Sequence, residues 1–142
     1  MQTAASAQSD PFLGTWKLNV AKSDFADGPA ETSETRVFEP WETDGITYTA
    51  TVVLADGTRS THSFSAHYDG KDYKFTGSPN LDTISLKRVD ANTFEFTGKK
   101  NGNVVGTGKN VVSKDGKTTT RTVTATDLQG QKIASTGVFD KL

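Results

Sequence analysis

The chain has 142 residues, a formal net charge of −1 and no cysteine. This length fits one domain, near-neutral charge argues against a nucleic-acid partner, and the lack of cysteine excludes disulfides and thiol nucleophiles. No apolar run approaches the roughly 20 residues of a membrane-spanning helix. Two histidines cannot build a typical zinc site, so we expect no metal and no cofactor.

Residues 1–10 are expected to form a disordered tail or the remnant of a secretory signal peptide. They include Ala-Ser-Ala followed by Gln at 5–8, which is the small-x-small pattern that a signal peptidase accepts. This interpretation predicts a secreted or periplasmic protein. The rest of the chain, residues 11–142, is expected to be a single domain.

Asp-Gly or Asn-Gly recurs between alternating segments at 44–45, 56–57, 69–70, 101–102 and 115–116. Both dipeptides tolerate the positive φ angles of tight hairpin turns, so the pattern predicts an antiparallel meander. One short helical segment is expected over 19–28. The predicted strands cover 13–20, 34–41, 45–54, 58–68, 72–76, 83–89, 93–100, 103–113, 117–127 and 131–140.

Most of these strands alternate apolar and polar residues, and each therefore has one apolar face. About ten such strands in a flat sheet would leave that face and two edges exposed, whereas closure into a barrel removes both problems. The fold class predicted is all-β: an up-and-down antiparallel barrel of about ten strands. A barrel of this size tends to enclose a cavity.

The segment Gly-Thr-Trp-Lys-Leu at 14–18 resembles the Gly-x-Trp motif that begins the first strand of the calycin barrels, which include lipocalins and fatty-acid-binding proteins. The resemblance implies that Trp16 closes one end of the barrel against an arginine, for which Arg121 is the first candidate and Arg88 the second. Ten strands favour the fatty-acid-binding branch. Together with the signal-peptide-like pattern at the start of the chain, the resemblance suggests an exported bacterial lipocalin-like protein.

The C-terminal strand departs from the fatty-acid-binding pattern at two positions. In that family an arginine and a tyrosine near the C-terminus grip the ligand carboxylate. Gly137 and Phe139 occupy the matching positions here, so the family's anchor is absent.

Polar residues on the inner face are the candidates for orienting a ligand. His62 could switch charge or act as a base, or could be an ordinary strand histidine. Arginines could pair with an anionic group, or could stack on Trp16. The aromatic residues could line a cavity or fill a core. The predicted ligand-binding residues are Arg36, Phe38, Tyr48, His62, Phe64, Tyr73, Arg88, Phe94, Phe96, Asn110 and Phe139.

These features favour a module that binds or carries a small hydrophobic or amphipathic molecule in the barrel lumen. The alternative is a cofactor-free enzyme, a cyclase or isomerase, that folds a hydrophobic substrate into a reactive shape with His62 or a tyrosine as acid or base. A third possibility is a filled barrel that acts through its surface. Ligand identity, catalysis and oligomeric state stay open at this stage.

Overall fold

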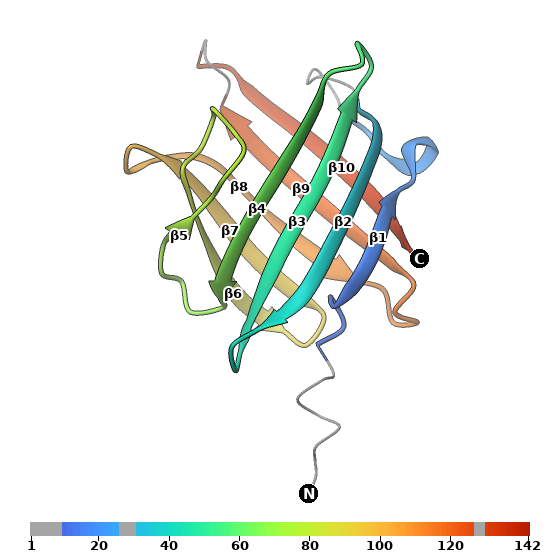
Figure 1. Cartoon of the computed structure of the whole chain (residues 1–142), viewed down its shortest axis with the longest axis vertical. Helices are drawn as coiled ribbons and strands as arrows, with labels where there is room; N and C mark the ends of the chain where they lie inside the picture. Colours follow the sequence, from blue (N-terminus) through green and yellow to red (C-terminus); the bar gives the residue numbers. More distant parts are fainter. Residues whose placement is uncertain (1–9, 26–30, 127–129) are drawn as a thin grey trace, which may run out of the picture.

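The computed structural model describes residues 10–25, 31–126 and 130–142, and these form ten strands and one short helix (Figure 1). The predicted all-β, up-and-down antiparallel barrel is confirmed. The elements are β1 (Gly14–Leu18), η2 (Val20–Lys22), β2 (Glu31–Trp41), β3 (Gly45–Leu54), β4 (Arg59–His67), β5 (Tyr73–Lys74), β6 (Thr83–Asp90), β7 (Thr93–Lys100), β8 (Asn103–Val112), β9 (Thr118–Thr126) and β10 (Lys132–Lys141).

The strands follow the order β4-β3-β2-β1-β10-β9-β8-β7-β6-β5 in one sheet. Pairing of β1 with β10 joins the two ends of the chain, with Trp16 opposite Lys141. The barrel nearly closes between β4 and the short β5, where Ser63 and Thr76 exchange two backbone hydrogen bonds of 2.9 Å. At this junction, the seam of the barrel wall, an isolated bridge takes the place of a regular strand pairing.

Two predicted turns differ in how they use glycine. Asn101 and Gly102 both have positive φ, 52° and 83°, as a tight hairpin turn between β7 and β8 requires. At the β2–β3 connection the positive φ belongs to Glu42 instead, and Gly45 is the first residue of β3. Glycine is needed there because a Cβ would lie 2.7 Å from the carbonyl oxygen of Ala66.

The helical segment predicted over 19–28 is a single 3-10 turn, Val20–Lys22. The side chain of Asn19 caps the turn by accepting from the Lys22 amide, and Ser23 Oγ accepts from the Val138 amide of β10. These bonds return the chain to the sheet after three residues. Residues 26–28 of the predicted helix and 1–9 of the predicted tail lie outside the described residues. No helix in the described part of the chain meets the length and hydropathy of a membrane span.

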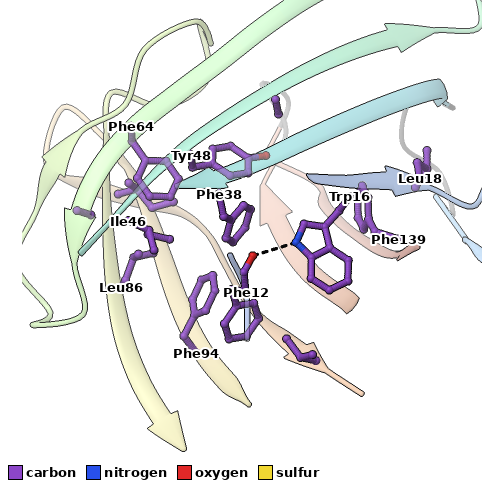
Figure 2. Packing of buried hydrophobic residues seen from close by; sticks show 14 residues of the cluster. Phe12, Trp16, Leu18, Phe38, Ile46, Tyr48, Phe64, Leu86, Phe94 and Phe139 are labelled. Atoms are coloured by element: carbon purple, nitrogen blue, oxygen red, sulfur yellow. Dashed lines mark hydrogen bonds between the residues drawn. The ribbon is translucent and has the colours of Figure 1, made fainter. Parts of the chain in front are cut away.

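One end of the barrel is filled by aromatic side chains (Figure 2). Trp16 is 1% exposed, and its Nε1 donates to the carbonyl oxygen of Phe12 at 2.9 Å. The Phe12 ring meets Phe94 edge-on with 4.7 Å between centroids and stacks on Phe38 at 6.2 Å. Trp16 therefore closes this end from inside, as the sequence predicts.

The predicted arginine partner of Trp16 is wrong. The cation over the indole is Lys141, whose Nζ lies 5.4 Å from the ring centroid. Arg121 binds Glu34 in the lumen, and Arg88 binds Asp10, which lies against the barrel although the sequence placed it in the tail. Lys141 reaches the indole because β10 pairs directly with β1.

Candidate functional site

The barrel encloses a cavity of about 560 Å³, which falls in the range of roughly 300–1,000 Å³ typical of small-molecule sites. Its wall combines rings, small side chains and a few polar groups. Eight of the predicted ligand-binding residues line it: Arg36, Phe38, Tyr48, His62, Phe64, Phe94, Phe96 and Asn110.

The two ends of the cavity differ in what bounds them. Phe38 and Phe94 lie at the end closed by the aromatic cluster. At the other end the wall includes Leu81, Asn80 of the β5–β6 loop and Thr126 of β9, and the last two are exposed. The cavity therefore reaches solvent at the end opposite Trp16.

The remaining three predicted residues lie elsewhere. Tyr73 packs edge-on against Trp41, with 6.1 Å between ring centroids. Arg88 Nη2 forms a 3.0 Å ion pair with Asp10. Phe139 is fully buried behind the polar wall of the lumen rather than on its surface.

A buried arginine crosses the lumen. Arg36 on β2 is 3% exposed, and its Nη2 donates to Asn110 Oδ1 on β8 at 3.1 Å. Three strands separate β2 from β8 in the sheet order, so this bond spans the barrel interior rather than neighbouring strands. On β8, Gly108 and Gly106 lie between Asn110 and the open end of the cavity. The Phe96 ring covers Gly108 so closely that a Cβ on Gly108 would lie 2.5 Å from the ring.

Glu34 belongs to a buried charged cluster, with Glu31 and Arg121, that the predicted ligand-binding residues did not include. It is 1% exposed and accepts from Arg121 Nη1 at 3.2 Å. Burial alone would raise its pKa, but Arg121 and the neighbouring Glu31 and Arg36 outweigh burial and hold the pKa below its usual value. The alternation of Glu34, Arg36 and Phe38 along β2 was the signal that could have placed it inside.

Arg121 reaches Glu34 because β10 leaves room for it. Its guanidinium occupies the space beside Gly137, where a Cβ would lie 3.3 Å from Arg121 Nη2. Burial tends to lower the pKa of Arg121, but Glu34, Tyr48 and Glu31 raise it overall. Gly137 thus accommodates an arginine from the neighbouring strand β9.

Glu31 completes the cluster at the start of β2. Burial, a hydrogen bond to Glu34 and the charge of Glu34 raise the pKa of Glu31 to about 8, against the opposing effect of Arg121 and Arg36. With a pKa of about 8, the Glu31 carboxyl group keeps its proton at neutral pH. At neutral pH the cluster of Glu31, Glu34, Arg36 and Arg121 therefore carries two positive charges and one negative charge.

The guanidinium of Arg36 is not saturated by its protein partners. Its Nε and Nη1 have no hydrogen-bond partner among the described residues. Nε lies 3.9 Å from Glu34 Oε2, close enough for charge attraction but too long for a hydrogen bond. The flat group lies 4.3 Å from the ring centroid of Phe139 and 5.4 Å from that of Tyr48. Burial lowers its pKa, yet an arginine keeps its charge in proteins.

His62 lies on β4, in the same row of the sheet as Ala50 of β3 and Arg36 of β2. It is partly buried against Phe75, with 5.7 Å between ring centroids. Burial lowers its pKa, so the imidazole is neutral at pH 7. In the part of the chain that the structure describes, no group of three or more histidine and acidic side chains is placed to hold a metal ion.

No protein-family model matches this chain, and no curated protein matches its sequence. Solved structures do match over nearly its whole length. A variant of the fluorescent protein UnaG has a TM-score of 0.64 and 14% identity, over 93% of this chain and 96% of that chain. The barrel EF1p2_mFAP2b bound to DFHBI has a TM-score of 0.57 and 12% identity, over 98% of this chain and 100% of that chain.

The redesigned β-barrel mFAP1, also bound to DFHBI, has a TM-score of 0.53 and 16% identity, over 95% of this chain and 99% of that chain. These proteins share with this chain the fold of an up-and-down antiparallel β-barrel. At such low identities the likeness concerns the fold alone. Two of these three structures are described as bound to DFHBI.

Proposed function

We propose that this calycin-like barrel binds and carries a small, largely apolar molecule in its lumen. The observation that carries the proposal is the cavity of about 560 Å³, with Phe64, Phe96 and Leu86 in its wall. Burial of apolar surface drives such binding at roughly 25 cal/mol per Å². The solved barrels bound to DFHBI support the proposal, since they hold a small molecule in the same type of fold.

The cavity exists because side-chain size falls from the closed end to the open end. Large rings fill the closed end, whereas Gly98, Gly106 and Ala125 line the wall nearer the opening. A Cβ on Gly106 would come only to ordinary contact distance, 3.5 Å, from the Cβ of Ala125. Small residues at these positions leave room for a ligand in the part of the lumen nearest the opening.

The proposal is tested with Nile red, a neutral dye whose fluorescence rises in apolar surroundings. Ala125→Phe adds a ring inside the cavity, and Thr124→Phe adds the same ring at the exposed neighbouring position. We expect Nile red to bind the native protein and the Thr124 variant alike. The Ala125 variant should bind about tenfold more weakly or worse, since it loses the apolar contact area that a ligand would bury.

Circular dichroism and thermal unfolding of each variant establish that it is folded before binding is compared. Nile red should also raise the unfolding temperature of the native protein, because a ligand that binds only the folded state stabilises it. Equal binding by both variants, or no binding by the native protein, would contradict a lumen site.

A further inference from the structure

We propose that the lumen ligand carries one anionic group, which docks against the guanidinium of Arg36, and that Glu31 must be protonated for this docking. The inference rests on the proposed lumen binding and deepens it by assigning the chemical class of the ligand. It points to an amphipathic acid, with its charged group deep in the barrel and its apolar body toward the open end.

The first argument is the unmet hydrogen-bonding capacity of Arg36. Its side chain is 4% exposed and lines the cavity, yet Nε and Nη1 are buried without a hydrogen-bond partner. Buried donors are normally satisfied, and one left unmatched costs roughly 1–3 kcal/mol or more when charged. An acceptor that enters the cavity can fill this role, and an anionic acceptor forms the stronger, charge-assisted bond.

The second argument is the charge of the cluster. Arg36 and Arg121 are balanced by Glu34 alone while Glu31 carries its proton, which leaves one uncompensated positive charge inside the barrel. A buried charge without a counter-charge is costly, so a monoanion stabilises the cluster and a cation does not. A neutral ligand fills the cavity but leaves the positive charge of the cluster uncompensated.

The third argument is the position of the guanidinium among rings. Phe139, Phe38 and Tyr48 surround it at 4.3, 5.1 and 5.4 Å from their centroids. These rings hold Arg36 in one orientation, and the aromatic cluster around Trp16 closes the barrel behind it. A ligand reaches Arg36 through the cavity, so a molecule that brings an acid group there must bury an apolar body as well.

The protonation state of Glu31 sets the net charge of the cluster. Glu31 Oε2 lies 3.9 Å from Arg121 Nη2, and its other oxygen, Oε1, is buried without a hydrogen-bond partner among the described residues. Loss of the proton adds a negative charge to the cluster and cancels its positive excess. Tyr48 stays neutral because burial raises its pKa. The titratable and charged side chains that act on Glu31 are Glu34 and Arg36 of β2, Tyr48 of β3 and Arg121 of β9.

The charge preference is tested by displacement of Nile red at pH 7 with dodecanoic acid, dodecanol and dodecylamine, which share one chain. We expect the acid to compete at least about tenfold better than the alcohol, and the amine to compete worst. Arg36→Gln should remove the advantage of the acid over the alcohol. Arg59→Gln, at an exposed position of β4, is the matched control and should leave it intact.

Failure of this inference differs visibly from failure of lumen binding. If Nile red binds and the acid and alcohol compete equally, the anionic ligand is wrong while the lumen site stands. If Nile red does not bind at all, the lumen site itself is wrong. Should Arg36→Gln fail to fold, the comparison of the three probes on the native protein decides the question.

The proton requirement is tested by the affinity of dodecanoic acid between about pH 6.5 and about pH 9.5, where the free acid stays ionised. We expect the native affinity to fall several-fold as pH rises through about 8, the pKa of Glu31. His62 adds no charge change there, because its pKa is lowered. Glu31→Gln keeps an uncharged hydrogen-bond donor next to Glu34 and should bind the acid equally well across the range.

Glu39→Gln on the exposed face of the same strand is the matched control and should follow the native profile. A native affinity that does not change through pH 8 would overturn the proton requirement. So would a decline in Glu31→Gln as steep as in the native protein.

Discussion

Trp16 is held at the barrel floor by a hydrogen bond as well as by packing. Its Nε1 donates to the Phe12 carbonyl at 2.9 Å in a buried setting. Trp16→Phe keeps a ring but leaves that carbonyl without a partner, so we expect the free energy of unfolding to fall by about 1–3 kcal/mol in a urea titration. Lys141→Gln removes only the cation above the indole and should cost less, at most about 1 kcal/mol. A Trp16→Phe variant as stable as the native protein would show that the bond contributes nothing.

At the scale of single residues, alternation was a good guide to the apolar wall and a poor one to its charges. It placed Phe38, Tyr48 and Phe64 inside, and all three line the cavity. It also placed Glu34 on the same face as Arg36, but Glu34 was not among the predicted ligand-binding residues. Whether a charged residue stays inside depends on a partner that crosses the lumen, and a one-dimensional pattern does not report such partners.

At the scale of elements, the seam between β4 and β5 is where we expect the barrel wall to open first. Gly77 has a φ of +102°, and a Cβ there would lie 1.9 Å from the Thr61 carbonyl oxygen of β4. Gly77→Ala should therefore push the 76–82 segment away from β4. Hydrogen exchange should then quicken at the amides of Ser63 and Thr76, which bond each other across this seam.

Gly70→Ala is the matched control for this seam. Gly70 also has a positive φ, +78°, but nothing lies within 4 Å of the Cβ it would gain. Both variants place a Cβ at a residue with positive φ, and only Gly77→Ala adds a collision with β4. Equal exchange rates at Ser63 in the two variants would show that close packing does not hold the seam.

The elements themselves were largely predictable because turn chemistry marks the ends of hairpins. Asn101-Gly102 fixed the β7–β8 turn, and the strands around it match their predicted bounds within a residue. The segment after β1 was less predictable: a helical segment expected over ten residues became one 3-10 turn. Ser23 and Val138 form the bond that stops it, and their separation of 115 residues lies beyond any local signal.

At the scale of the whole molecule, the sequence predicted a closed meander with an internal cavity, but not the charged cluster inside it. Arg36 and Asn110 meet across 74 residues, and Arg121 and Glu34 across 87. Each contact joins strands that are not neighbours in the sheet. Such contacts follow from barrel closure rather than from any local pattern, so the partners of the lumen charges could be assigned only from coordinates.

The Glu31 cluster also makes the stability of the whole barrel depend on pH. The folded-state pKa of Glu31, about 8, exceeds the ordinary value of 4.5, so between these values the folded state holds a proton that the unfolded chain has lost. Stability contributed by Glu31 is fully present below about pH 4.5 and is lost as pH rises through about 8. Glu31→Gln cannot lose a proton.

We therefore expect the unfolding temperature of Glu31→Gln, relative to that of the native protein, to rise between pH 4.5 and about 8 and then to level off. Thermal unfolding followed by circular dichroism across this range measures the difference, and Glu39→Gln at an exposed position corrects for the loss of one surface charge. The difference curve is the informative quantity, because titrating groups that do not interact with Glu31 contribute equally to both proteins and cancel. A difference that stays constant from pH 4.5 to 9 would mean that Glu31 ionises normally in the folded barrel, and the excess positive charge assigned to the lumen would then be absent.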